Sequence, residues 1–276
     1  MSLSKKCLIV IVLLFAAAAC KREATPPASQ PQAAPSPPVE DIPAPVAVPE
    51  LKDVIETTDR YLIGVSYPPT INRYPGLAQA AYAYTEQARA ALMEAAGAFG
   101  NDTPPAPYEL SLSYQMLLET PRLVALSADG SRYTGGAHAE PLVERFVWLP
   151  QQQRMLTLEA LVPTVKGWAA IGSHVREQLH TSASVRAEAD NLPPAERLRF
   201  VRNADKMIDE GTGPEAENFS RYEPITDSSG RITALRFVFP PYQVGPYAEG
   251  TQSVEVPVTV VLPHVAPEYR ELFAGS

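Results

Sequence analysis

YELSLSYQMLL, residues 108–118, is the part of this chain whose pattern indicates most about its fold. Large apolar side chains alternate there with serine and glutamine, so the pattern repeats every two residues. This period is typical of a strand that turns one face to a core and the other to solvent. The stretch therefore predicts a half-buried strand.

The chain continues with further strands after this one. They are predicted at residues 122–127, 141–149 and 155–158. Asp129-Gly130 has the residue types that adopt the left-handed conformations of a tight hairpin turn, and another turn is expected at 151–154. Consecutive strands joined by short turns predict an antiparallel meander.

A helix is predicted on the N-terminal side of residues 108–118. Apolar residues recur at spacings of three and four in an alanine-rich stretch, at Leu77, Ala81, Tyr84, Ala88, Leu92, Ala95 and Phe99. Such spacing places them on one helical face, and their small volume suits close packing against a sheet. The folded part is expected to begin near Leu51, with a strand at 61–67 before the helix.

The C-terminal half is predicted to contain two helices and then a second group of strands. The helices are expected at residues 165–179 and 193–211, and the strands at 219–225, 232–239 and 254–260. Proline cannot donate a hydrogen bond to a neighbouring strand, so Pro257 favours an edge position for the last one. The predicted fold class is α+β: an antiparallel meander sheet packs against three or so helices, with two sub-lobes in one compact region.

The first twenty residues have the features of a bacterial secretory signal. Two lysines precede an apolar run, which ends in four alanines and Cys20. These alanines resemble a lipobox, with Ala17 in place of the commoner leucine, so residues 1–19 are expected to be a signal peptide and Cys20 a lipidated residue. A transmembrane helix is the alternative, but residues 7–20 fall short of the roughly 20 that span a bilayer.

Residues 20–50 are expected to be the lipid-bearing cysteine and a tether. Residues 21–49 contain nine prolines and no aromatic residue, a composition that cannot bury enough apolar surface to fold. A ligand for a proline-recognition module is the alternative for this segment. Lys21 stands where an aspartate commonly retains lipoproteins at the inner membrane. We therefore expect a lipid anchor in the outer membrane, with the protein facing the periplasm.

Charge and composition limit the classes of molecule that this protein is expected to bind. The formal net charge is −8 at pH 7, which argues against nucleic acid and would attract a basic protein. Of the two cysteines, Cys7 belongs to the signal and Cys20 to the anchor, so no disulfide is expected in the exported part. The four histidines are scattered without a metal-binding motif. No metal and no cofactor are predicted.

The string YTGGAH at residues 133–138 is the first candidate site. Paired glycines at a point where strands should continue indicate positive φ angles or a bulge, either of which can direct a neighbouring side chain. Its candidate binding residues are Tyr133, Thr134, Gly135, Gly136 and His138. His138 could act as a general base or bind a ligand. The alternative is a structural histidine that bonds neighbouring backbone groups.

The second candidate site is the loop QVGPYAEG at residues 243–250, together with the tyrosine that precedes it. Tyr242, Tyr247 and Glu249 are its candidate binding residues. Exposed aromatic side chains there would suit a protein partner or a sugar. The alternative is that the loop packs against the bend at Gly135 and Gly136.

The strings YLIGVSYPPT, SRYTGGAHAE, RFVWL and RFVFPPYQVGPYAEG together resemble the DUF4163/DUF3298 family, over about residues 55–273. The exported part of RsiV-type anti-sigma factors and the appended module of some peptidoglycan deacetylases are similar. The resemblance implies a DUF4163-like part at 51–105 and a DUF3298-like part at 106–276. It also implies a domain that binds lysozyme directly. The cytoplasmic segment and transmembrane helix of an RsiV-type regulator are not expected in this chain.

Three hypotheses for the function follow. The first is an envelope lipoprotein with a non-catalytic domain that recognises a basic muramidase or a peptidoglycan fragment. The second is a hydrolase of peptidoglycan or another envelope polymer, with His138 as base and a nearby carboxylate orienting it. The third is a structural or assembly lipoprotein. None of the common nucleophile, phosphate-binding or dinucleotide-binding motifs is present in the sequence, which favours binding over catalysis.

Overall fold

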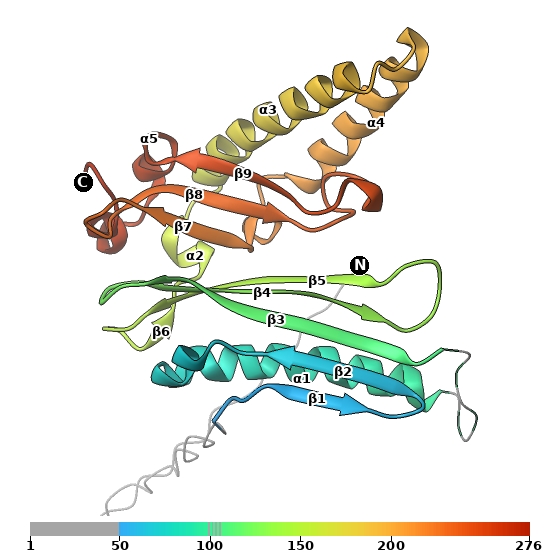
Figure 1. The fold of residues 1–276 in the computed structure, drawn as a ribbon. Helices are drawn as coiled ribbons and strands as arrows, with labels where there is room; N and C mark the ends of the chain where they lie inside the picture. Colours follow the sequence, from blue (N-terminus) through green and yellow to red (C-terminus); the bar gives the residue numbers. More distant parts are fainter. Residues whose placement is uncertain (1–49, 99, 101, 103, 105) are drawn as a thin grey trace, which may run out of the picture. The chain divides into compact units, whose positions relative to one another are not determined.

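The computed structural model of the protein describes residues 50–276, apart from 99, 101, 103 and 105. The predicted signal peptide, Cys20 and almost all of the predicted tether lie outside the described residues. The described part contains a six-stranded sheet of order β1-β2-β3-β4-β5-β6 and a three-stranded sheet of order β7-β8-β9, with several helices (Figure 1). The predicted α+β fold class is confirmed.

The six-stranded sheet is mixed. Its strands are β1 (Val54–Thr57), β2 (Tyr61–Ser66), β3 (Tyr108–Glu119), β4 (Val124–Tyr133), β5 (Glu140–Leu149) and β6 (Arg154–Met155). Neighbouring strands pair antiparallel, except for β2 and β3, which are parallel. A parallel pair needs a crossover connection, and helix α1 (Pro75–Gly97) supplies it. Strand β3 buries every second residue along its first half, as predicted.

Helix α1 covers one face of this sheet and builds the first core. The buried residues of its predicted stripe include Leu77, Ala81, Ala88 and Leu92, and they pack against apolar side chains of β2 to β5. The first core also contains a short polar chain. The Thr85 hydroxyl lies 2.7 Å from that of Tyr67 and 2.9 Å from that of Tyr114, and Tyr114 donates to the carbonyl of Ala81.

The second core lies between the opposite face of strand β5 and the elements that follow it in the chain. Phe146 and Trp148 belong to the first core, whereas the alternating residues Val147 and Leu149 belong to the second. The other elements are α2 (Leu158–Leu161), α3 (Val165–Ala189), α4 (Pro194–Gly211), β7 (Tyr222–Thr226), β8 (Ile232–Phe239), β9 (Gln252–Pro257) and α5 (Val258–Val261). Because β5 is buried on both faces, it is apolar along most of its length.

The predicted hairpin turn at Asp129-Gly130 is wrong. Strand β4 runs through both residues and pairs Gly130 with Leu112 of β3. A Cβ atom at position 130 would overlap the carbonyl oxygen of Ser111, so the glycine permits close approach of two strands. The turn between β4 and β5 lies further on, where Gly135 and Gly136 have φ angles of 94° and 104°.

The end of the chain also differs from its prediction. The last strand stops at Pro257, and Val258–Val261 forms helix α5, although valines alternate with other residues across that boundary. The edge position of β9 in its sheet is as predicted. Strand β6 is shorter than expected because the Thr157 side chain caps α2 by accepting from the Ala160 N–H.

Three further elements differ from their predictions. Strand β1 is not predicted by the sequence pattern. Helix α3 runs ten residues past the predicted end at 179, and Phe219, the predicted first residue of a strand, lies in a 3₁₀ turn before β7. None of the helices in the described part of the chain is long and apolar enough to cross a membrane.

Candidate functional site

The two candidate strings of the sequence meet in space. The hydroxyl of Tyr242 lies 2.9 Å from Nε2 of His138, and the His138 ring stacks on that of Tyr247 with centroids 4.0 Å apart and planes inclined by 11°. The two tyrosine rings lie 5.8 Å apart. We call these three residues the aromatic cluster. His138 is exposed and Tyr242 is 54% exposed, so the cluster faces solvent.

The glycines of the 133–138 string shape the turn that carries His138. Gly135 and Gly136 both have positive φ, a conformation that disfavours other residues. The Tyr133 hydroxyl donates to the Gly136 carbonyl at 3.3 Å and closes the turn. Thr134 is only partly exposed beside them. These residues thus hold the turn that presents His138.

The loop that carries Tyr242 is closed by a backbone hydrogen bond of its own and is attached to the rest of the domain by the Gln243 side chain. The N–H of Tyr242 donates to the carbonyl of Gly245 at 2.8 Å. The Gln243 side-chain amide donates to the carbonyls of Gly211 at 3.1 Å and Asn218 at 2.7 Å. Tyr242 itself has a φ of 73°, which costs a non-glycine residue about 1–2 kcal/mol. Such strain at an exposed aromatic residue points to a functional position.

Glu249 anchors this loop instead of joining the aromatic cluster. It lies in the 3₁₀ turn Tyr247–Glu249, and its Oε2 atom pairs with Arg186 of α3 at 2.8 Å. The same oxygen accepts from the Gln252 side chain at 3.0 Å. The carboxylate is therefore engaged within the domain.

The loop also lines two hollows. Pro246 and Glu249 face helix α4 across a groove of about 420 Å³, whose apolar wall includes Phe200 and Met207. Pro240 lines a smaller polar pocket of about 200 Å³. Neither hollow could be predicted from the sequence, because their other residues come from elements far apart in the chain. Arg132 and Glu140 of the polar pocket did stand within the quoted string SRYTGGAHAE.

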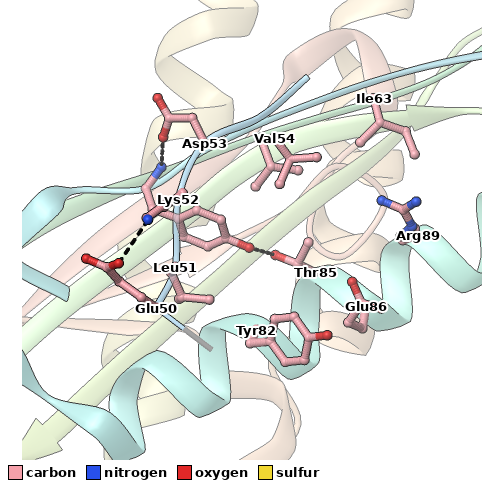
Figure 2. Close-up of a pocket in the computed structure, with 12 residues that line it drawn as sticks. Glu50, Leu51, Lys52, Asp53, Val54, Ile63, Tyr82, Thr85, Glu86 and Arg89 are labelled. Atoms are coloured by element: carbon pink, nitrogen blue, oxygen red, sulfur yellow. Dashed lines mark hydrogen bonds and ion pairs between the residues drawn. The ribbon is translucent and has the colours of Figure 1, made fainter. Parts of the chain in front are cut away.

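A further pocket lies away from the aromatic cluster, between the first described residues and α1. Figure 2 shows Leu51 and Val54 on one side and Tyr82, Thr85 and Glu86 on the other. Its volume is about 250 Å³.

The positively charged side chains of this pocket are paired with carboxylates, and burial changes the pKa of Tyr67, one of its tyrosines. Lys52 pairs with Glu50 at 3.0 Å, and Arg89 donates two hydrogen bonds to Glu56. Burial raises the pKa of Tyr67, whose hydroxyl is bonded to Thr85. No sequence motif marks the pocket, and its described cations are already paired. We assign it no ligand.

The aromatic cluster lacks a carboxylate-oriented base and a metal-binding group among the described residues. In the described residues, His138 is hydrogen bonded to a tyrosine and stacked on another, and no carboxylate orients its ring. Nor does the described part of the chain place three or more His, Cys, Asp or Glu side chains where they could hold a metal ion. The arrangement exposes aromatic rings to solvent, with the Tyr242 hydroxyl bonded to His138.

Comparisons with known proteins match two parts of the chain. Residues 54–140 match the family described as Deacetylase PdaC, and residues 204–259 match the family described as a protein of unknown function, DUF3298. The search of curated proteins found no match. The DUF4163 part of the resemblance and the boundary at residue 105 stay predictions.

Two solved structures are similar to the chain. A member of the DUF3298 family from Bacteroides fragilis is 17% identical, covers 79% of this chain and 92% of its own, and has a TM-score of 0.49. A DUF3298 family protein from Pseudomonas aeruginosa is 17% identical, covers 78% of this chain and 88% of its own, and has a TM-score of 0.50. At this sequence identity, the similarity to the Pseudomonas aeruginosa protein is a similarity of fold. The DUF3298 part of the resemblance is confirmed over residues 204–259, which match the model of that family.

Proposed function

We propose that this protein is a lipid-anchored envelope protein that binds a partner through its aromatic cluster without catalysis. The matches to Deacetylase PdaC and DUF3298 support an envelope-associated domain. The signal-like segment and Cys20 supply the anchor in this proposal. The aromatic cluster supplies the contact surface.

The observation that carries the proposal is the exposed and preorganised stack of His138 on Tyr247, bonded to Tyr242. Tyrosine is enriched among the residues that dominate binding energy at interfaces. Holding its ring in place before binding reduces the entropy lost on association. The backbone bonds at Tyr242 and the Gln243 anchor provide this order.

The partner we favour is a basic muramidase. The chain has a formal net charge of −8, and opposite charge speeds association and selects among partners. The family resemblance of the sequence implies lysozyme binding. A peptidoglycan fragment is the other candidate, since sugars also stack on aromatic rings.

Hydrolysis with His138 as base has less support. That mechanism needs a base oriented by a third group, and the described neighbours of His138 are tyrosines. The word deacetylase describes the matched family. The matched segment, 54–140, supplies β1 to β4 and α1 here, so we take the match to concern the architecture of the module.

Calorimetric titration of the purified full chain with an animal-type lysozyme tests the proposal. It is carried out at two salt concentrations, with an equally basic unrelated protein as control. Selective, saturable binding that persists at the higher salt would support the proposal. Binding that equals the control and disappears with salt would reduce it to screened charge attraction, and peptidoglycan fragments would be titrated next.

A further inference from the structure

The polar pocket beside Pro240 is a candidate binding site separate from the aromatic cluster. Its volume is about 200 Å³. Its polar lining comes from helix α1, the end of β4, the start of β5 and the residue before β7: Tyr84, Gln87, Arg132, Glu140 and Arg221. Two guanidinium groups thus line one small pocket.

Arg132 already holds a carboxylate. Its Nη2 atom lies 2.5 Å from Oε2 of Glu140, and its Nη1 atom donates to the Ala88 carbonyl at 3.4 Å. The Arg132 side chain is 17% exposed, whereas that of Glu140 is 59% exposed. Arg132 is therefore paired within the protein, and Arg221 is the other cation of the lining.

Arg221 is fixed in place but has spare donors. Its Nε donates to the Val143 carbonyl at 2.6 Å, and its own carbonyl accepts from the N–H of Val238 at 2.9 Å. Neither of its Nη groups has an acceptor among the described residues. A guanidinium in this state can donate two parallel hydrogen bonds to a carboxylate.

The carboxylates of the surrounding strands have hydrogen-bond or ion-pair partners other than Arg221. Asp129 and Glu223 pair with Arg145 at 2.9 and 2.6 Å. Glu144 accepts from the backbone N–H of Arg145 at 2.8 Å. No ion pair to Arg221 occurs within the described residues. The lining carries two arginines and one glutamate, a net formal charge of 2 − 1 = +1, which suits a monoanion better than a dianion.

Tyr84 adds a neutral donor to the same pocket. Its ring is held edge-on to Phe146, with centroids 6.1 Å apart. Burial, reinforced by Glu144 and opposed by Arg221, raises the pKa of Tyr84 to about 12. The hydroxyl therefore stays protonated at neutral pH and can donate to an anion.

We infer that this pocket binds the carboxylate of a small residue, such as the C-terminal carboxylate of a short peptide, with Arg221 as its main partner. Arg132 and Tyr84 line the same pocket and would assist. The site is independent of the aromatic cluster, and its ligand is independent of the muramidase proposed above.

Titration of the purified full chain with N-acetyl-alanyl-alanine, its C-terminal amide and inorganic phosphate tests this inference. A charged hydrogen bond is worth roughly 1.5–3 kcal/mol, so we expect the amide to bind at least about tenfold more weakly than the acid. Arg221→Gln should weaken binding of the acid by a similar factor. Arg231→Gln, a matched change at an exposed arginine bonded to Ser229, should leave it unchanged.

Equal binding of acid and amide to the unaltered chain would overturn the inference without relying on a variant. So would undetectable binding of the acid, full binding by Arg221→Gln, or phosphate binding tighter than that of the acid. Lysozyme titration of the same preparations separates the two proposals. Lysozyme binding without dipeptide binding contradicts the pocket alone, and the reverse result contradicts the aromatic cluster alone.

Discussion

The hydroxyl of Tyr242 lies 2.9 Å from Nε2 of His138, so one hydrogen bond joins two loops that are 104 positions apart in the chain. The β4–β5 turn supplies the histidine, and the segment between β8 and β9 supplies the tyrosine. Each loop relies on backbone with positive φ, at Gly135, Gly136 and Tyr242. The two glycines adopt these angles readily, so the costly conformation at this meeting point is that of Tyr242.

The strain at Tyr242 predicts an unusual order of stability among its variants. Tyr242→Gly and Tyr242→Ala both remove the ring and its hydrogen bond, but only glycine tolerates a φ of 73° without cost. We expect the glycine variant to be more stable than the alanine variant by about 1 kcal/mol. Urea unfolding of both variants measures this difference. An alanine variant as stable as the glycine variant would show that the backbone is unstrained.

The approach of β3 and β4 at Gly130 predicts a second large effect. A Cβ atom there would overlap backbone atoms of Ser111, which cannot move without separating the strands. Gly130→Ala should lower the free energy of unfolding by about 3 kcal/mol. Gly64→Ala is the matched control within β2, because nothing lies within 4 Å of its added Cβ. The control should be neutral or gain about 0.5 kcal/mol, and equal losses at both sites would refute the explanation.

Tyr84 predicts a dependence of stability on alkaline pH. Burial raises its pKa in the folded protein to about 12, above the value of about 10 in an unfolded chain. Its contribution is thus complete below about pH 10 and is lost as the pH rises toward 12. Tyr84→Phe should flatten the fall in unfolding free energy over this range, by about 1 kcal/mol or less because the ring is partly exposed. An identical pH profile for both proteins would contradict the shift.

Cys20 predicts how the protein is attached to the membrane. If this cysteine carries the lipid, Cys20→Ala should move the protein from the membrane fraction to the aqueous fraction of expressing cells. Mass spectrometry of the unaltered protein should show the added acyl chains on its N-terminal peptide. A Cys20→Ala protein that still partitions with membranes would favour a transmembrane segment at residues 7–20.

Periodicity predicted the long elements of this fold because burial alone determines them. The strand at 108–118 and the helix through Leu77 and Leu92 have one buried face each, and β8 was predicted at residues 232–239. Predictions from local residue types were wrong at positions where contacts between elements determine the structure. Asp129-Gly130 has turn composition, yet pairing with β3 keeps it in a strand. The valines near 258 alternate, yet they form α5.

The sequence also indicated the residues of the aromatic cluster but not that they meet. Positive φ at Gly135 and Gly136 was expected from the paired glycines. The bond from Tyr242 to His138 could not be predicted, because it depends on how the three-stranded sheet packs near the β4–β5 turn. For the same reason, the pairing of Glu249, a predicted binding residue, with Arg186 could not be foreseen from the sequence.

Titration of the full chain and two variants with an animal-type lysozyme tests the central claim most directly. Tyr242→Ala removes an exposed ring of the aromatic cluster, and Tyr82→Ala removes a ring of α1 that is 37% exposed. Loss of a dominant contact costs about 2 kcal/mol. We therefore predict at least about 30-fold weaker binding for Tyr242→Ala and unchanged binding for Tyr82→Ala. Lysozyme binding that is absent in the unaltered chain, or equal in all three proteins, would contradict the claim.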